Sequence, residues 1–252
     1  TKGYLQIPYK KYAYVKNRNG QHISLYGDRL KRVTGFDKDD PTLHESDIPP
    51  MTRFLVDQYT DSDESSTGHR VMFFDIEVEV TEGFPDVQKA YNPITSIALY
   101  DCITEKYFTY CFDPHKRIES YEKDNEVVEF YETEYEMLNQ FFQKYLEIRP
   151  TIISGWNSEF FDIPYLYNRA VRILGPELAN LLSPISQVIY SEYKKKHTIA
   201  GVSSLDYLQL YRQFTFTMQS SYRLDYIGEV EVGMKKVEYE GTLNDLYDND
   251  LQ

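Results

Sequence analysis

Two carboxylates with the spacing i, i+2 are the residues of this sequence best suited to chemistry. Asp75 and Glu77 lie in the stretch Val71–Val78, whose remaining residues are all apolar. Because side chains alternate between the two faces of a strand, both carboxylates are expected on the same face. Two like charges at an apolar strand are unfavourable unless a partner compensates them. A divalent cation that prefers oxygen ligands, Mg²⁺ or Mn²⁺, would be such a partner.

The same pattern has a second explanation, a strand with one face in solvent. Asp75, Glu77 and Glu79 would then simply point to water. On this stretch alone, a metal site and a solvated strand face both remain open.

A second segment, residues 151–166, supplies a third candidate carboxylate. A short β-branched run follows Pro150, and Pro164 suits the first turn of a helix, where its missing N–H donor does no harm. Asp162 therefore falls at a strand-to-helix junction. There it could cap the helix or reach a metal ion.

The order of the motifs along the chain carries more information than any one of them. Phe74–Glu77 is followed by Gly83–Pro85, then by Gly155–Asn157 with Phe161–Asp162, and finally by Ser221–Ile227. This series resembles the 3′-5′ proofreading exonuclease of B-family DNA polymerases, in particular those of T-even-type bacteriophages. The resemblance covers nearly the whole chain.

The resemblance implies that the protein hydrolyses the 3′-terminal phosphodiester bond with the help of two Mg²⁺ ions, for which Mn²⁺ can substitute. Asp75 would bridge both ions, Glu77 would orient the attacking water, and Asp162 would hold the second ion. These three residues are thus expected to be both catalytic and metal-binding. Lys236 is expected near the scissile phosphate, with the adjacent Lys235 as an alternative register.

The resemblance further implies a single-stranded 3′ end of primer DNA as the substrate. Phe84 would pack against the unpaired terminal base, since an aromatic face accepts any base. From the second motif, Asn157 would support the terminal nucleotide or the metal-bound water, and Phe161 is expected to bind the substrate.

Residues 187–202 have β-prone flanks around a charged centre, which predicts a protruding hairpin. It is either a surface hairpin with a solvated tip or, as the resemblance implies, an element that helps to separate primer from template. In the second case its lysines are offered to phosphates. These hairpin lysines are Lys194, Lys195 and Lys196.

By the same resemblance, Tyr222 and Arg223 are expected to contact DNA. The alternative is that Tyr222 is a buried tyrosine and Arg223 a surface arginine.

A third motif, Tyr-x-x-x-Asp, is implied after Gly241–Asp245. The match at Tyr59–Asp63 lies in a polar run before the first motif, and we interpret it as coincidence. We therefore expect the fourth carboxylate beyond Gln252, in polymerase domains that are covalently continuous or form a separate chain. This polypeptide alone is expected to bind metal weakly and to cut DNA poorly.

The formal net charge of −13 argues against a general nucleic-acid-binding protein, which would present a basic field. A nuclease that takes only a frayed end tolerates a negative exterior. Residues 119–136 carry eight acidic side chains and one lysine, which predicts a solvated face, with a sliding clamp as a candidate partner. The sequence shows neither a signal peptide nor a long apolar run, so we expect no membrane partner and a location in the cytoplasm of an infected bacterial host.

For residues 69–252 we predict an α/β, ribonuclease-H-like (DnaQ-like) exonuclease domain with a mixed sheet. Its expected strands are 71–80, 94–100, 106–112 and 151–154, with a hairpin at 187–202. A helix is expected over 133–148, with one apolar stripe at helical spacing. A second helix is expected to begin at Pro164. The stripe is predicted to be core, and consists of Leu138, Phe141, Phe142, Tyr145 and Leu146.

Residues 1–68 are expected to form part of a small α+β amino-terminal domain. Short strands at Tyr4–Pro8 and His22–Tyr26 would be joined through a turn at Asn19–Gly20. A helix over Met51–Tyr59 and a polar linker at Asp61–Gly68 follow.

Two other functions compete with the polymerase exonuclease. One is a non-catalytic module that binds single-stranded DNA or RNA. The other is a free-standing exonuclease, or a split polymerase subunit, whose fourth ligand comes from a partner chain. Dependence on metal separates the enzymes from the binding module.

Overall fold

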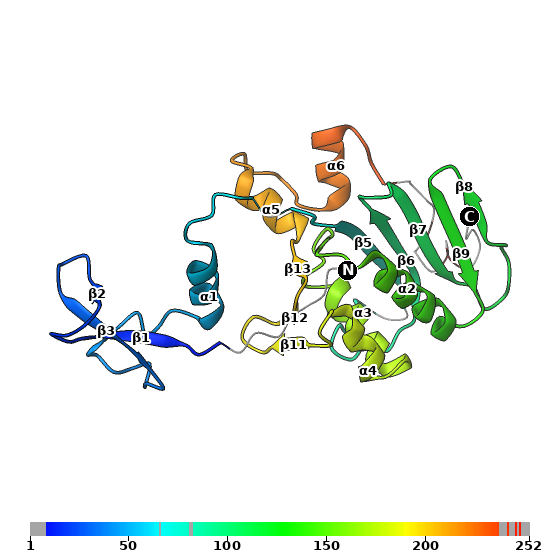
Figure 1. The fold of residues 1–252 in the computed structure, drawn as a ribbon. Coiled ribbons are helices and arrows are strands. Elements are labelled where there is room, and N and C mark those ends of the chain that lie inside the picture. The colour runs from blue at the N-terminus through cyan, green and yellow to red at the C-terminus, as the bar shows by residue number, and fades with distance from the viewer. Residues whose placement is uncertain are drawn as a thin grey trace. The chain divides into compact units, whose positions relative to one another are not determined.

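The structure is a computed structural model of the chain, and it describes residues 9–65, 67–80, 83–236, 241, 245 and 247. The chain divides into two compact units, Thr1–Thr67 and Gly68–Gln252. Each unit is described by itself (Figure 1). In the described part of the chain, no helix is long and apolar enough to cross a membrane.

The first unit contains a four-stranded antiparallel sheet in the order β2-β3-β1-β4 and one helix. Arg32 and Arg53 lie over the Tyr12 ring, 3.8 and 4.8 Å from its centroid, so cation–π contacts join sheet and helix. The elements are β1 (Tyr12–Lys16), β2 (His22–Ile23), β3 (Arg29–Thr34), β4 (Leu43–His44) and α1 (Pro50–Tyr59).

The predicted helix is confirmed as α1, but the predicted hairpin is wrong. Strand β1 pairs with β3 and not with β2, which is only two residues long. The polar turn at Asn19–Gly20 links β1 to β2, and apolar Leu25 after it is fully exposed. The expected strand Tyr4–Pro8 lies outside the described residues.

The second unit is built on a seven-stranded mixed sheet in the order β13-β10-β5-β6-β7-β9-β8. Strands β5, β6 and β7 are antiparallel, whereas β10 lies parallel to β5, and β9 parallel to β7. These pairings confirm the mixed sheet and its predicted strands. The strands are β5 (Val71–Val78), β6 (Ile94–Asp101), β7 (Lys106–Phe112), β8 (Tyr121–Lys123), β9 (Glu126–Tyr131), β10 (Ile152–Ser154) and β13 (Ser203–Ser204).

Helices and a separate hairpin complete this unit. The predicted hairpin is confirmed, because β11 (Val188–Ser191) and β12 (Lys196–Ile199) pair antiparallel. The helices are α2 (Glu134–Ile148), α3 (Asp162–Ile173), α4 (Pro176–Ala179), a 3-10 helix (Asn180–Leu182), α5 (Tyr207–Phe214) and α6 (Leu224–Val232). Helix α3 begins two residues before the predicted Pro164.

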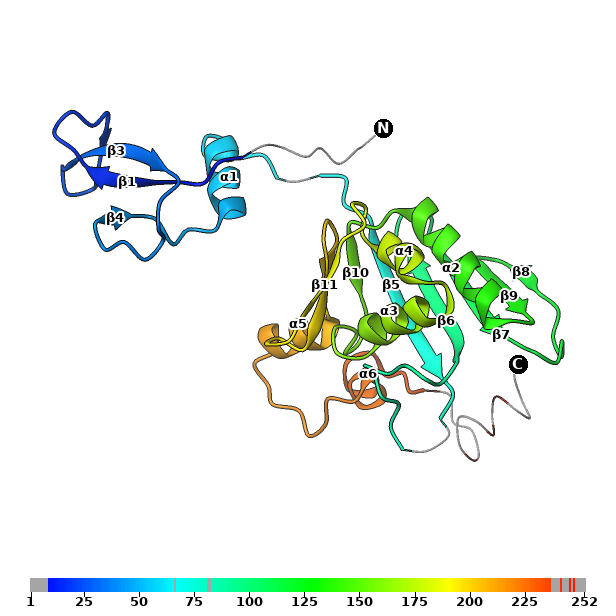
Figure 2. The same cartoon turned by 90° about the horizontal axis from the view of Figure 1, so that it is seen from below.

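The two faces of the sheet differ in what covers them. Met72, Phe74, Ile76 and Val78 of β5 are buried in the core. Helices α2 and α3 lie over one face of the sheet (Figure 2). The alternate residues Phe73 and Asp75 are exposed on the opposite face. The alternation predicted for this strand is therefore present, and it directs the carboxylates away from the core.

Two predictions about residues 119–148 need correction. Leu146, expected in the core, is 39% exposed, because each helical residue turns by about 100° and places it past the edge of the stripe. The acidic stretch is not only a solvated face. It contains the β8–β9 pair, and Glu134 within it is buried against Arg169.

Candidate active site

A strand and a helix bring two of the three candidate carboxylates together. Asp75 stands in the middle of β5, and Asp162 lies in the first turn of α3, where it is only 3% exposed. Asp162 Oδ1 accepts a hydrogen bond from the backbone N–H of Ile76 at 3.1 Å. The start of α3 is thus fixed against the strand that carries Asp75 and Glu77.

The surrounding protein disfavours the charged form of all three carboxylates by desolvation. It raises the pKa of the buried Asp162, and the neighbouring charge of Asp75 raises it further. It also raises the pKa of Asp75, although this residue as a whole is exposed, and Lys236 and a hydrogen bond with Asp162 oppose that shift. The pKa of Glu77 is raised by burial, although nearby Lys236 opposes this shift. The charge of Lys236 therefore offsets the three carboxylates only in part.

The two candidate lysines after α6 occupy different places. Lys236 Nζ lies 3.7 Å from Glu77 Oε1. Lys235 Nζ pairs with Glu229 of α6 at 2.9 Å. Lys236 is the lysine at the carboxylates, as the sequence register favoured.

The loop between β10 and α3 has a tight backbone that only glycine permits at residue 155. A Cβ on Gly155 would lie 2.6 Å from the carbonyl oxygen of Phe74. Asn157 follows in the left-handed region with φ 65°. Its N–H donates to Asp206 Oδ1 at 3.1 Å, and its carbonyl accepts from the N–H of Phe161. The loop holds the entry to α3 in one conformation.

Phe84 and Phe161 form an aromatic pair beside Asp162. Their ring centroids are 5.2 Å apart, and Phe161 packs in turn on Tyr165. Phe84 is 80% exposed. One aromatic face is thus presented to solvent next to a buried carboxylate, an arrangement that can accept an unpaired base.

The three hairpin lysines have different environments. Lys196 Nζ pairs with Glu159 at 2.7 Å and is half-buried, and Lys195 pairs with Glu192 at 2.7 Å. The exposed Lys194 makes no ion pair with the described residues. Of the three, Lys194 is the one whose charge is available to a phosphate.

Tyr222 and Arg223 lie in different environments. The backbone carbonyl of Tyr222 accepts a hydrogen bond from Trp156 Nε1 at 3.1 Å, and the guanidinium of Arg212 lies over the Tyr222 ring. Tyr222 therefore supports the loop that carries Asn157. Arg223 is exposed, and its nearest carboxylate partner is Asp225 at 3.6 Å.

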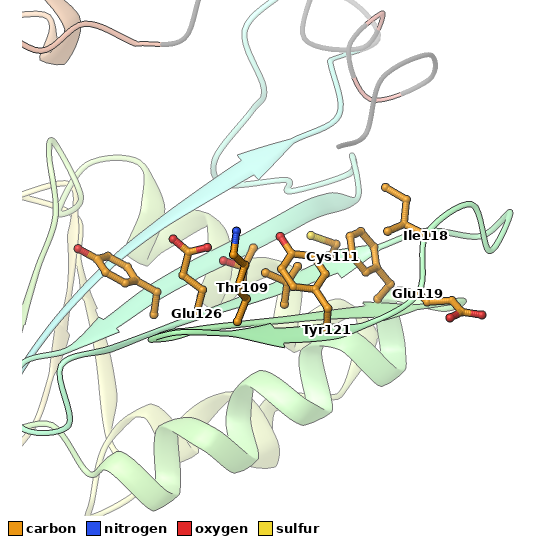
Figure 3. A pocket seen from close by; sticks show the side chains of 10 residues that line it. Thr109, Cys111, Ile118, Glu119, Tyr121 and Glu126 are labelled. Atoms are coloured by element: carbon orange, nitrogen blue, oxygen red, sulfur yellow. The ribbon is translucent and has the colours of Figure 1, made fainter.

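Two hollows lie on the sheet face opposite α2. One of about 460 Å³ begins at Asp75 and is lined mainly by apolar side chains, among them Phe73, Trp156 and Leu224. The other, of about 850 Å³, lies over β7, β9 and β8, around Thr109, Cys111 and Tyr121 (Figure 3). Only the first adjoins the carboxylates, so we place the candidate site there.

No three His, Cys, Asp or Glu side chains among the described residues are already arranged to hold a metal ion. The donor set nevertheless fits one. Asp75, Glu77 and Asp162 offer only carboxylate oxygens, the ligands of Mg²⁺ and Mn²⁺, and a divalent cation would relieve their raised pKa values.

Asp206 is a site residue to which the sequence analysis assigned no role. It is 3% exposed, caps α5 at Leu208 N and accepts from the N–H groups of Asn157 and Glu159. Its position directly before the helical stretch 207–214 is an N-cap signal in the sequence. Its links to Asn157 and Glu159, 49 and 47 residues earlier, come from the fold.

The family model described as "DNA polymerase family B, exonuclease domain" matches residues 55–227 of this chain. The chain belongs to this family. This membership confirms the resemblance predicted from the motifs, and it agrees with the mixed α/β fold. The match covers the loop of Phe84, both carboxylate segments and the hairpin.

Curated relatives include polymerases of T-even-type phages. The DNA-directed DNA polymerase of Escherichia phage RB69 is 35% identical over 212 residues, which is 73% of this chain and 23% of the relative. That of Enterobacteria phage T4 is 32% identical over 206 residues, 70% of this chain and 23% of the relative. DNA polymerase 1 of Saccharolobus solfataricus is 30% identical over 131 residues, 52% of this chain and 13% of the relative. The chain thus spans about a quarter of the length of the phage polymerases it matches.

Proposed function

We propose that this chain is the 3′-5′ proofreading exonuclease part of a phage-type replicative DNA polymerase, acting on single-stranded 3′ ends of primer DNA. The observation that carries the proposal is that Asp75 and Asp162 share a hydrogen bond, while the exposed ring of Phe84 packs on Phe161, the residue before Asp162. Family membership supports the exonuclease class.

In this proposal Asp75, Glu77 and Asp162 hold two divalent cations, Mg²⁺ with Mn²⁺ as a substitute. When bound, the ions would supply Lewis acidity at the scissile phosphate and stabilise charge on the leaving oxygen. Glu77, on the solvent side of β5, orients the attacking water. Lys236, 3.7 Å from Glu77, is within reach of the phosphate.

The remaining residues bind the DNA end. Phe84, supported by Phe161, contacts the terminal base, and Asn157 lies beside the terminal nucleotide. Lys194 and Arg223 offer exposed positive charges to the phosphates of the strand. Recognition by stacking and by phosphate charge suits an enzyme that must remove all four nucleotides.

The polymerase context is also part of the proposal. The proposed partners are polymerase domains, either covalently continuous with this chain or in a separate chain. The protein would act in the cytoplasm of an infected bacterium, with a sliding clamp as a candidate partner.

The test is digestion of a 5′-labelled single-stranded oligonucleotide with Mg²⁺, with Mn²⁺ and with a chelator. We expect metal-dependent shortening from the 3′ end that Asp75→Asn and Asp162→Asn each reduce by at least about 100-fold. The matched control Glu122→Gln removes an exposed carboxylate from the same sheet and should leave the rate unchanged.

If the chain alone is inactive, the assay is repeated with the polymerase region supplied on the same or a separate polypeptide. Recovery of metal-dependent cleavage would support a site completed by that region. Binding of the oligonucleotide without cleavage in both cases would instead favour the non-catalytic binding module.

A further inference from the structure

The segment that carries Phe84 has no regular structure of its own. Residues 83–93, which lead from β5 to β6, contain no helix or strand. A turn at Asp86–Ala90, closed by hydrogen bonds to Asp86, gives it some local order. The place of the whole segment depends on the elements that bind it.

Helix α3 binds this segment through side chains on one face. Tyr165 Oη donates to the Asn92 carbonyl at 2.9 Å, and Asn168 Nδ2 to the Val87 carbonyl at 2.9 Å. Arg169 Nη1 donates to the carbonyls of Ala90 and Tyr91 at 3.1 and 2.6 Å. Tyr165, Asn168 and Arg169 have the spacing i, i+3, i+4, which places them side by side on a helix.

Arg169 is itself held by Glu134, the first residue of α2. Nε and Nη2 of Arg169 donate to the two carboxylate oxygens of Glu134 at 2.8 and 2.5 Å. Each residue is 7% exposed, and Glu134 Oε1 also accepts from the N–H of Ile94 at the start of β6. A bidentate pair of this kind fixes the direction of the guanidinium plane.

We propose that Arg169 and Glu134 are positioning residues for the terminal nucleotide. They fasten residues 83–93 to the helix that begins with Asp162, and so keep the Phe84 ring at one place relative to that carboxylate. The inference rests on the proposed exonuclease function. Neither residue touches the substrate, and both act through the segment that carries Phe84.

The test variant is Arg169→Lys. Lysine retains the positive charge that pairs with Glu134 but lacks the planar guanidinium group. It therefore cannot bind both carboxylate oxygens of Glu134 and the two backbone carbonyls at the same time. The matched control is Arg70→Lys. Arg70 makes the same bidentate contact with Asp101, at the end of β5 remote from the Phe84 segment.

We expect Arg169→Lys to raise KM for a single-stranded oligonucleotide by about tenfold with kcat changed less than about twofold. In a Phe84→Ala background the same change should raise KM by less than about twofold, because the ring it positions is gone. Hydrogen exchange of the amides in residues 83–93 should accelerate in Arg169→Lys and not in Arg70→Lys.

Two results would overturn the inference while leaving the exonuclease proposal intact. One is an equal rise in KM for Arg169→Lys and Arg70→Lys, and the other is a tenfold effect of Arg169→Lys that persists in the Phe84→Ala background. If the wild-type protein shows no metal-dependent cleavage even with the polymerase region supplied, the function proposal fails instead. Hydrogen exchange then still decides whether Arg169 holds the segment.

Discussion

Three carboxylates, one in the first turn of α3 and two along β5, have a nearby cation in Lys236, which compensates their charge only in part. Asp162 is buried, Asp75 is its neighbour, and the pKa of each is raised. The buried Glu134, in contrast, forms a two-bonded pair with Arg169. Sites that keep partly uncompensated charge are typical of function, because a bound ion can supply the missing charge.

At the same scale, the exposed ring of Phe84 leads to a prediction. Phe84→Ala should raise KM for single-stranded ends by about tenfold, because stacking on an aromatic ring contributes roughly 1–3 kcal/mol per base. Phe84→Trp should retain wild-type KM. Since the ring is 80% exposed, neither variant should change the midpoint of thermal unfolding. Steady-state kinetics and calorimetry check these outcomes, and a KM unaltered in Phe84→Ala would remove the ring from the site.

At the scale of elements, the loop before α3 is held from two sides. Gly155 approaches the backbone of β5, and Asp206 binds the N–H groups of Asn157 and Glu159. The hairpin β11–β12 joins the same loop through the Lys196–Glu159 ion pair. These contacts connect four segments that are distant in sequence, and they fix the direction in which α3 presents Asp162.

The hairpin gives a prediction that separates its lysines. Lys194→Ala should weaken binding of single-stranded DNA and reduce the slope of log affinity against log salt by about 0.7, the value expected for one phosphate contact. Lys195→Ala is the matched control, because Lys195 already pairs with Glu192. Titrations at several salt concentrations give both slopes. Equal slopes for Lys194→Ala and the wild type would show that the hairpin tip does not contact phosphate.

At the scale of the whole molecule, the second unit is built on one sheet, and the two faces of this sheet have different surroundings. One face packs against α2 and α3 to form the core. The opposite face bears Asp75 and the apolar hollow next to it. Buried ion pairs tie the ends of the central strands, with Arg70–Asp101 at one end of β5 and Arg169–Glu134 near the other.

The Arg70–Asp101 pair predicts how stability depends on pH. Arg70 holds the pKa of Asp101 well below its usual range, so the folded state binds fewer protons there than the unfolded state. Its contribution is complete above pH 5 and is lost as pH falls through about 4 and below. Asp101→Asn should therefore cost roughly 3 kcal/mol at pH 7 and about 1 kcal/mol less at pH 3, because pH 3 lies only about one unit below the pKa of the unfolded carboxyl.

Urea unfolding at pH 7, 5 and 3 measures this difference. Glu122→Gln, which breaks an exposed pair with Lys106, serves as control and should cost less than about 1 kcal/mol at each pH. A cost for Asp101→Asn that is the same at pH 7 and pH 3 would contradict the electrostatic origin.

Local sequence patterns predicted most strands and helices of the second unit and the family of the chain. Alternation in Val71–Val78 predicted a strand with Asp75 on one face, and helical spacing predicted α2, because such local periodicities follow from backbone geometry alone. The order of the motifs pointed to the family that the comparison confirmed. In the first unit, the predicted turn at Asn19–Gly20 does not close a hairpin, because β1 and β2 both pair with β3. Such partner choice depends on contacts far along the chain.

Tertiary structure alone decided which residues meet. Nothing in the local pattern of Glu134 distinguishes it from its acidic neighbours, yet it is buried against Arg169, 35 residues away. The distinction between Lys194 and Lys196 likewise depends on Glu159, which lies 37 residues before Lys196. A carboxylate next to a guanidinium in a low-dielectric interior is a structural partner, whereas the same carboxylate in water is a solvated charge. Burial and distance, which set that difference, exist only in the folded chain.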